Sequence, residues 1–342
     1  MQTLQVQIKN KINSKTKPQG SLGALEDIAL KLGLNQKSLS PQITDPTIII
    51  FAADHGAAVQ PNISAFPQGV TKQMLLNFSN GGAAINVFCK LNDIHLRVIN
   101  CGVIDAFDMN KIDNYSIQES TNNYLIEASM NKLQLSKCFE NGETIIDKYL
   151  LVKPNCNLLG FGEMGIGNTA SASLIMHCIT NIPLKKCVGK GTGLSQMQVE
   201  KKLQLLSEAL NLYSFNKNSI EDILIHFGGF EIATMCGSFL TAAKRGITFL
   251  VDGFIATAAY TCAYKINENI SEYAIFSHCS SENGHQLLLD FLNAKPLLNL
   301  KMRLGEGTGC AMALPILQAS CAFLNQMASF ESAGVSEMEN NI

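Results

Sequence analysis

The feature that most constrains the fold of this chain is a glycine-rich turn between an apolar run and a run of small residues. Four glycines fall within the eight residues 160–167, directly after the apolar pair Leu158-Leu159. The residues that follow, 170–175, are small or apolar and suit a helix. A strand, a tight turn and a helix in this order offer free N–H groups and a positive helix end to an anion. A purely structural turn gives the same pattern, so this segment alone leaves both interpretations open.

Three polar residues of this turn are candidates for ligand binding. Asn168 and Thr169 can cap the helix or donate to phosphate oxygens. Glu163 carries a negative charge that repels phosphate, so at the same ligand it would face a sugar or a reacting base. The pattern G-x-x-G-x-G over 162–167 differs from the dinucleotide-binding pattern G-x-G-x-x-G.

Apolar, β-branched runs that end in polar residues recur along the chain and predict a parallel sheet. The first run, 46–53, ends in Asp54-His55-Gly56. Similar runs predict strands at 94–100, 222–227, 246–251, 273–276 and 297–304, with helices at 70–90, 142–152 and 197–212. Strands that alternate with helices predict an α/β fold with a Rossmann-like parallel sheet. Ligands of such sheets bind at the carboxyl ends of the strands.

The two ends of the chain have a helical character of their own. Residues 1–40 read as polar helices interrupted by Pro18 and Gly20, and residues 310–342 form a final helical region. We expect residues 41–309 to form a large α/β catalytic domain. Residues 1–40 plus 310–342 would then form a small helical domain.

Composition excludes several classes of protein. The formal charge is 26 − 28 = −2, which gives no global attraction to nucleic acid or to an anionic membrane. Eleven cysteines without a C-x-x-C pair indicate reduced thiols in a cytoplasm rather than a disulfide framework. The N-terminus lacks the apolar run of a signal peptide. The apolar segments 247–264 and 310–330 contain polar residues and read as buried elements.

Two glutamates flanked by glycine, Glu163 and Glu306, are the candidate catalytic groups. Glycine neighbours let a carboxylate lie close to a ligand and away from water, which raises its pKa toward neutrality and suits it to act as a base. A carboxylate that caps a nearby helix is the alternative for either residue.

Other chemistries have weaker support. His55, His278 and His285 could bind a metal with Asp54 or Asp252, but no known ligand spacing supports this, and we expect no metal. A serine hydrolase would need a G-x-S-x-G turn, which the sequence lacks. The lysine of the segment 189–193 does not follow the spacing of a phosphate-binding P-loop.

Taken together, the motifs of this chain resemble one family, the nicotinate-nucleotide:dimethylbenzimidazole phosphoribosyltransferases of cobalamin biosynthesis. The resemblance runs from about residue 17 to residue 334. The matching motifs are Lys-Pro-x-Gly-Ser-Leu-Gly (17–23), Ala-Asp-His-Gly (53–56), Asn-Gly-Gly-Ala-Ala-Ile-Asn (80–86), Gly-Glu-Met-Gly-Ile-Gly-Asn-Thr (162–169), Gly-Lys-Gly-Thr-Gly (189–193), Asp-Gly-Phe (252–254) and Arg-Leu-Gly-Glu-Gly-Thr-Gly (303–309). No single motif is specific, but the set is.

The resemblance implies a reaction and roles for residues. Nicotinate mononucleotide and 5,6-dimethylbenzimidazole, or a similar base, would give α-ribazole 5′-phosphate and nicotinate. The resemblance makes Glu306 the general base and Glu163 the group that steadies the ribose or its developing positive charge. The residues implied to contact the mononucleotide are Gly165, Gly167, Asn168, Thr169, Lys190 and Ser280. Those implied to line the base pocket are Phe66, Gln73 and Leu304. The family also implies a homodimer and a reaction that needs no metal or organic cofactor.

One departure from the family concerns the base pocket. The family often has tyrosine where this chain has Phe66, so a hydroxyl near the base is missing and the preferred base is open. Two other functions are alternatives to this one. A Rossmann oxidoreductase predicts a dinucleotide fingerprint after the first strand, where Asp54-His55-Gly56 stands instead. An inactive nucleotide-binding relative predicts loss of the base, yet Glu306 and its glycines are present.

Overall fold

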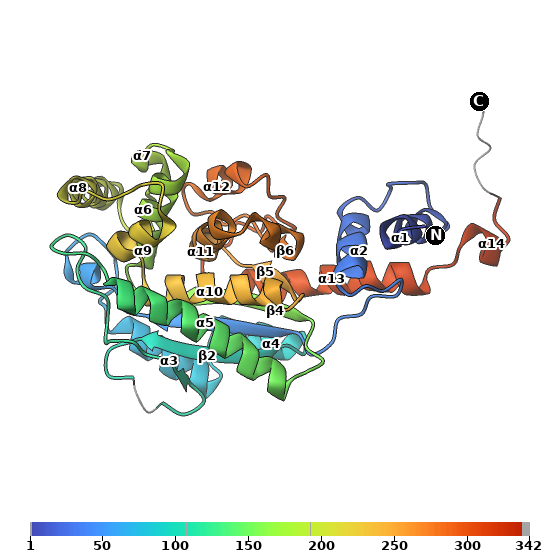
Figure 1. Ribbon diagram of the computed structural model, residues 1–342, viewed down its shortest axis with the longest axis horizontal. Coiled ribbons are helices and arrows are strands. Elements are labelled where there is room, and N and C mark those ends of the chain that lie inside the picture. Colours follow the sequence, from blue (N-terminus) through green and yellow to red (C-terminus); the bar gives the residue numbers. More distant parts are fainter. Residues whose placement is uncertain (1, 107–108, 192, 337–342) are drawn as a thin grey trace.

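The computed structural model describes residues 2–106, 109–191 and 193–336, and within them six strands form one parallel sheet (Figure 1). The strands are β1 (Thr47–Ala53), β2 (His95–Gly102), β3 (Asp113–Asn114), β4 (Leu158–Met164), β5 (Thr248–Val251) and β6 (Ala274–Phe276). Their order is β3-β2-β1-β4-β5-β6, and every neighbouring pair is parallel. This is the order of a doubly wound sheet, so the predicted Rossmann-like α/β fold is confirmed.

Both faces of the sheet are buried, which explains the continuous apolar run of β1. Ile49 and Phe51 point into one core, and Ile48 and Ile50 point into the other. Because side chains alternate along a strand, a central strand covered on both faces must be apolar at every position.

Helices cover the two faces (Figure 1). Those that contribute to the Phe51 core are α5 (Lys132–Val152), α6 (Asn168–Thr180), α8 (Gln196–Leu212), α9 (Ile220–Phe227), α10 (Phe230–Lys244), α11 (Phe254–Ile266) and α12 (His285–Phe291), with the short α7 (Leu184–Cys187). Those that contribute to the Ile50 core are α2 (Ala24–Asn35), α3 (Val70–Asn80), α4 (Ala84–Leu91) and α13 (Thr308–Gln326). Two short 3-10 turns span Gly56–Val59 and Glu268–Glu272.

A third, small core lies at one end of the molecule, where α1 (Leu4–Asn13), α2 and α14 (Phe330–Ala333) gather around the far end of α13 (Figure 1). Ile8, Ile12, Ala29 and Leu324 are its buried residues. Within the described residues, the N-terminal and C-terminal segments therefore lie side by side, with a bridge between Lys15 and Ser329, as a helical unit built from both ends requires. Its division from the remainder into separate domains stays a prediction, because α13 runs continuously through both.

Two predicted strands and one predicted helix are wrong in detail. Residues 222–227 belong to helix α9, because Ser219 caps its N-terminus and the apolar residues have helical spacing. The segment 297–304 forms no strand and has only an isolated bridge at Leu298. The helix predicted over 70–90 is two helices, since Gly81 adopts a left-handed conformation with φ of 80° and ends α3.

Helix α13 is long and apolar enough to cross a membrane by length and composition. However, 56% of its most apolar window is buried inside the protein. Its buried residues include Cys310, Leu314 and Leu317, which pack under the sheet. We therefore describe α13 as a core helix.

Candidate active site

The candidate site lies where the sheet changes direction, at the carboxyl ends of β1 and β4. These neighbouring strands pair in parallel, and the chain winds away from them to opposite sides. Asp54 and His55 follow β1, and Glu163 lies near the end of β4. Such a switch point leaves a crevice outside the strand ends, where ligands of open α/β sheets bind.

A small cavity of about 70 Å³ lies at these strand ends. Of the residues that the sequence predicts for the site, it brings together Glu163, Gly165, Asn168, Thr169, Ser280 and Leu304. Its wall also contains Gly191, Gly253, Phe254, Glu282, Arg303 and Gly305. The site is thus assembled from loops that are far apart in the sequence.

The turn after β4 is shaped by its glycines. An ideal Cβ placed on Gly162 would collide with the backbone of Gly307, so only glycine lets these two loops touch. Gly167 has φ of 99° and directly precedes α6. The first residue of that helix, Asn168, donates its side-chain amide to the Glu163 carboxylate. The amide and the free N–H end of α6 therefore meet at the same wall of the cavity.

Glu163 is almost fully buried, with 6% of its surface exposed. Burial raises the pKa of its carboxyl group to about 8, and the negative charge of Asp252 adds to the shift. The hydrogen bond from Asn168 acts in the opposite direction. Without a cationic ligand, Glu163 is therefore mostly protonated at neutral pH.

Glu306 is held in an uncommon backbone conformation. Its φ is 62°, and its neighbours Gly305 and Gly307 also have positive φ, at 83° and 75°. A non-glycine residue in this region costs about 1 kcal/mol or more, and such strain often marks functional sites. The side chain is 5% exposed, and burial, then the charge of Asp252, raises its pKa to about 7. Glu306 does not line the 70 Å³ cavity, although the adjacent Gly305 does.

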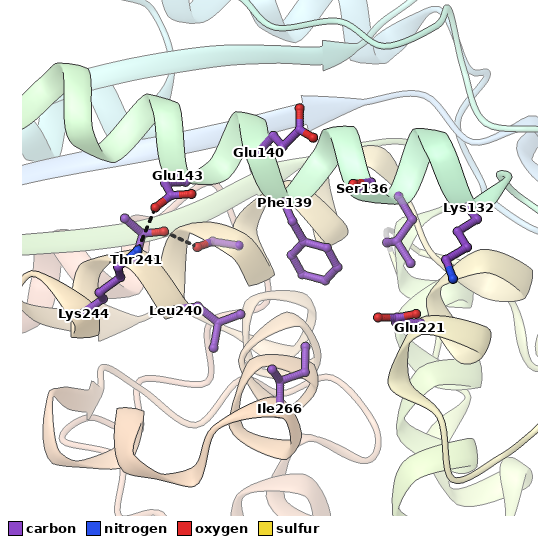
Figure 2. A pocket seen from close by; sticks show the side chains of 12 residues that line it. Lys132, Ser136, Phe139, Glu140, Glu143, Glu221, Leu240, Thr241, Lys244 and Ile266 are labelled. Carbon is purple, nitrogen blue, oxygen red and sulfur yellow. Dashed lines mark hydrogen bonds and ion pairs between the residues drawn. The ribbon is translucent and has the colours of Figure 1, made fainter.

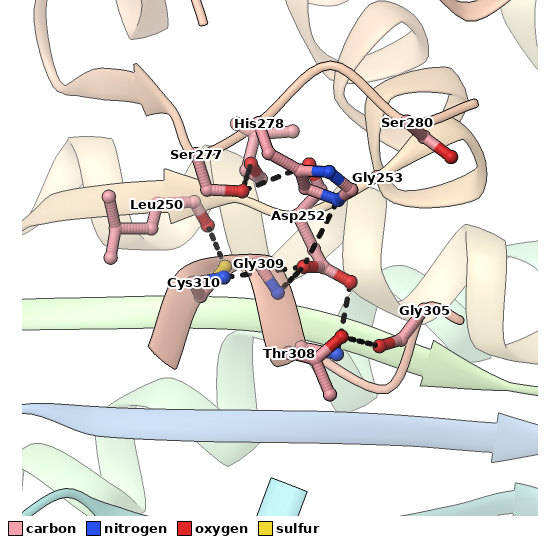
Figure 3. Close-up of polar contacts among 12 residues, drawn as sticks. Leu250, Asp252, Gly253, Ser277, His278, Ser280, Gly305, Thr308, Gly309 and Cys310 are labelled. Carbon is pink, nitrogen blue, oxygen red and sulfur yellow. Dashed lines mark hydrogen bonds and ion pairs between the residues drawn. The ribbon is translucent and has the colours of Figure 1, made fainter. Parts of the chain in front are cut away.

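Asp252, which the sequence suggested only as a possible metal ligand, organises the loop that carries Glu306 (Figure 3). It follows β5, and its carboxylate accepts N–H bonds from Gly307 at 3.0 Å, Gly309 at 2.7 Å and Cys310 at 3.3 Å. A carboxylate in this position satisfies the free N–H groups at the start of α13. Its place at a strand end was the signal that could have identified it.

Lys202 on α8 is the second residue that the sequence analysis missed. Its side chain is fully buried, and its Nζ donates to the Thr169 hydroxyl at 2.9 Å. Burial lowers the pKa of this amine to about 8, and the nearby Glu282 opposes that effect. The signal lay in helix periodicity, because Lys202 shares the buried face of α8 with Leu206 and Ala209.

Lys190, by contrast, lies outside the small cavity. It is exposed and lines a neighbouring cavity of about 730 Å³, which shares Glu282 and Arg303 with the site. Thr192 of the same motif lies outside the described residues. Ser280 is buried within the site, and its N–H donates to His285 Nδ1 at 2.8 Å.

The predicted base-pocket residues are more open. Phe66 is 48% exposed and Leu304 is 55% exposed, and Gln73 is also exposed on α3. Phe66 and Gln73 do not line the 70 Å³ cavity. Four of the six predicted nucleotide residues therefore line this cavity, and Gly167 and Lys190 do not. Two of the three predicted base contacts also lie outside it.

The described residues contain no group of three or more His, Cys, Asp or Glu side chains arranged to hold a metal ion. A larger cavity of about 510 Å³ lies between α5, α9 and α10, with Phe139, Leu240 and Ile266 in its wall (Figure 2). It contains none of the predicted site residues. We therefore place the candidate site at the strand ends.

Comparison with known proteins gives consistent matches over the whole chain. The family described as Phosphoribosyltransferase matches residues 1–335. The nicotinate-nucleotide–dimethylbenzimidazole phosphoribosyltransferase of Dechloromonas aromatica is 47% identical, over 98% of this chain and 97% of its own length. The enzyme of the same name from Photobacterium profundum is 46% identical, over 96% and 95%. The crystal structure of CobT from Thermus thermophilus superposes with a TM-score of 0.92 at 31% identity, over 98% and 99%.

Proposed function

We propose that this chain, which belongs to the phosphoribosyltransferase family, transfers the phosphoribosyl group of nicotinate mononucleotide to 5,6-dimethylbenzimidazole or a related base. The products are α-ribazole 5′-phosphate and nicotinate. This reaction serves the assembly of the nucleotide loop of cobalamin. The full-length similarity to enzymes of this name supports the proposal.

One observation supports the assignment on physical grounds: hydrogen-bond donors that suit an anion lie close to buried carboxyl groups that suit a cation. The start of α6 and the Lys202–Thr169 pair favour an anion. The buried carboxyl groups of Glu163 and Glu306 favour a cation. Nicotinate mononucleotide carries both charges, a 5′-phosphate and a pyridinium ring bonded to the ribose.

At the phosphate end, we assign the contacts to backbone and side-chain donors of the α6 turn, namely Gly165, Gly167, Asn168 and Thr169. Lys202 supports Thr169 and supplies the positive charge. A phosphate beside Lys202 would favour the protonated amine, because opposite charges stabilise each other strongly where water is excluded. Ser280 also lines the cavity and would donate to the same ligand. Lys190 would need to move inward to contact it.

At the reacting end, we assign the role of general base to Glu306. Its carboxylate takes the N–H proton of the benzimidazole while the other ring nitrogen attacks the anomeric carbon. The bond to nicotinate breaks on the opposite face, so the β configuration becomes α. A pKa of about 7 leaves roughly half of the Glu306 population ionised at neutral pH, which suits a general base.

Glu163 acts on the positive charge. The pyridinium of the substrate and the developing charge on the ribose would favour its ionised form and lower its raised pKa. The resulting carboxylate stabilises the transition state more than the ground state, because positive charge on the ribose grows as the bond to nicotinate breaks. The nicotinate ring leaves neutral, so the leaving group needs no acid, and we propose no metal or organic cofactor.

We assign the base pocket to Phe66, Gln73 and Leu304, and we propose that the protein works as a homodimer. Phe66 and Leu304 are about half exposed, so a second copy that covers them would remove apolar surface from water. Light scattering on the purified protein tests this assembly. A mass of one chain at micromolar concentration would exclude it.

We also propose a cytoplasmic protein that binds neither nucleic acid nor a membrane. All eleven cysteines lie in the described residues, and all are buried free thiols. The net charge of −2 offers no attraction to a polyanion. Mass spectrometry under non-reducing, denaturing conditions should find free thiols, and several intact disulfides would contradict this location.

The function is tested by incubating the purified protein with nicotinate mononucleotide and a mixture of benzimidazoles, purines and phenols. Mass spectrometry should find an α-nucleotide of 5,6-dimethylbenzimidazole together with free nicotinate. Release of nicotinate without any nucleotide product would indicate a hydrolase instead. Glu208→Gln, which changes an exposed carboxylate on α8, is the matched control for variants of Glu306.

A further inference from the structure

Three buried polar side chains form a hydrogen-bonded network next to residues 165–168, which we call the nucleotide turn. His55 Nε2 contacts Glu231 Oε1 at 2.6 Å, and His55 Nδ1 contacts the Ser171 hydroxyl at 3.1 Å. All three residues are 0% exposed. The chain connects three elements: the loop after β1, the first turn of α10 and the first turns of α6.

These three side chains, His55, Glu231 and Ser171, cannot contact a substrate. Full burial of all three side chains excludes direct contact with a ligand at the cavity, and none of them lines it. The Ser171 hydroxyl is therefore not a nucleophile, although the order serine, histidine, carboxylate resembles that of hydrolases. A buried polar chain of this kind fixes the positions of the elements that it joins.

The elements that it joins include the nucleotide turn. Glu231 Oε1 lies 3.2 Å from the position that a Cβ on Gly165 would occupy, and His55 Cβ lies 3.4 Å from that of Gly167. A Cβ on Gly229 would overlap both Glu231 and His55, so the backbone of α10 also closes over the pair. The nucleotide turn therefore packs directly against His55 and Glu231.

His55 also reaches toward the predicted base loop. Its backbone carbonyl accepts a hydrogen bond from the Gln68 side chain at 3.0 Å. Gln68 lies in the loop that contains Phe66, directly before α3. The same residue therefore holds the nucleotide turn through its side chain and the base loop through its backbone.

We propose that His55, held by Glu231 and Ser171, is a positioning residue that fixes the nucleotide turn 165–168 in its binding conformation. With the turn fixed, Asn168 stays on Glu163 and the N–H groups of α6 point at the phosphate. Loss of the hydrogen bonds among His55, Glu231 and Ser171 would let the nucleotide turn move and would weaken nucleotide binding. The affinity for the base would change little. The identity of the nucleotide rests on the proposed function, but the ordering of the turn does not.

The experiment uses Ser171→Ala, His55→Gln and their combination in the full-length protein. Glutamine keeps a donor near the Nε2 position for Glu231 but lacks the group that meets Ser171. We expect each single variant to raise the dissociation constant of nicotinate mononucleotide by about three- to tenfold, as the loss of one hydrogen bond implies. The combined variant should have the same dissociation constant as His55→Gln alone, because both changes remove the same contact between His55 and Ser171.

Ser238→Ala is the matched control. Ser238 is also 0% exposed and lies on α10, but its hydroxyl donates to Thr234 and Gly142 carbonyls away from the turn. It should lower the unfolding temperature as Ser171→Ala does, without changing nucleotide affinity. Calorimetric titration with nicotinate mononucleotide gives the affinities.

Amide hydrogen exchange of the segment 161–170, without any ligand, gives a second measure. Exchange should be faster in Ser171→Ala than in wild type and unchanged in Ser238→Ala. Unchanged exchange in Ser171→Ala, or additive losses of affinity in the combined variant, would overturn the positioning role. If wild type fails to bind the nucleotide while the exchange result holds, the proposed function fails and the positioning role stands.

Discussion

Asn168, the first residue of α6, donates its side-chain amide to the carboxylate of Glu163, five residues earlier at the end of β4. This bond joins the helix that we propose to bind the phosphate to the acidic group of the proposed reacting end. It also lowers the pKa of Glu163, against the much larger effect of burial. The two halves of the proposed site therefore depend on each other.

We predict that Asn168→Ala moves the activity to higher pH. Removing the amide raises the pKa of Glu163 further, so a higher pH is needed to ionise it. The rising limb of kcat/KM against pH should shift upward, with a loss of about tenfold at pH 7. A profile that falls uniformly at every pH would show that Asn168 acts only on binding.

The stability of the ligand-free protein should fall as pH rises. The folded-state pKa of Glu163 is about 8, above the ordinary value of 4.5, so between these values the folded state binds more protons than the unfolded state. Glu306, with a folded-state pKa of about 7, acts in the same direction. Glu163→Gln should therefore stabilise the protein at pH 8, on the order of 4 kcal/mol, and much less at pH 5. Urea unfolding at both pH values measures this, and an equal change at both would contradict it.

Much of this arrangement follows from the sequence, because strand ends and glycine-rich turns have strong local signals. The run 46–53 identifies β1, and the turn 162–169 identifies the proposed nucleotide end of the site. Lys202 was missed because a lysine on a helix is usually exposed, and only its place on an apolar face indicates burial. The helix at 220–227 was predicted as a strand because its β-branched residues outweighed the cap at Ser219.

Lys202→Met should separate nucleotide binding from stability. Methionine keeps the length and apolar contacts of the side chain but removes the charge. Because a bond to a charged group contributes about 1.5–3 kcal/mol, KM for nicotinate mononucleotide should rise roughly ten- to hundredfold. The unfolding temperature should stay equal or rise, since burial already disfavours the protonated amine. Lys201→Met, one residue away and exposed, is the control and should leave KM unchanged.

Phe66→Tyr should change the choice of base. Phe66 offers an apolar face, so 5,6-dimethylbenzimidazole should be preferred over hydroxybenzimidazole or adenine. A tyrosine hydroxyl adds a polar contact and should narrow that preference by about three- to tenfold, the ratio that a single hydrogen bond supplies. Product ratios from a competition between bases measure the effect. Unchanged product ratios would show that residue 66 does not select the base, and Gln73 and Leu304 would be the next candidates.

The most direct test of the account is the rate of α-ribazole 5′-phosphate formation by Glu306→Gln. Glutamine keeps the shape of the side chain but cannot take the proton from the base. With saturating substrates at pH 8, we predict that Glu306→Gln forms the product about 10²–10⁴-fold more slowly than wild type. Its affinity for nicotinate mononucleotide should be nearly unchanged. The control Glu208→Gln should form the product at the wild-type rate. A Glu306→Gln rate within about threefold of wild type would contradict the assignment of Glu306 as the general base.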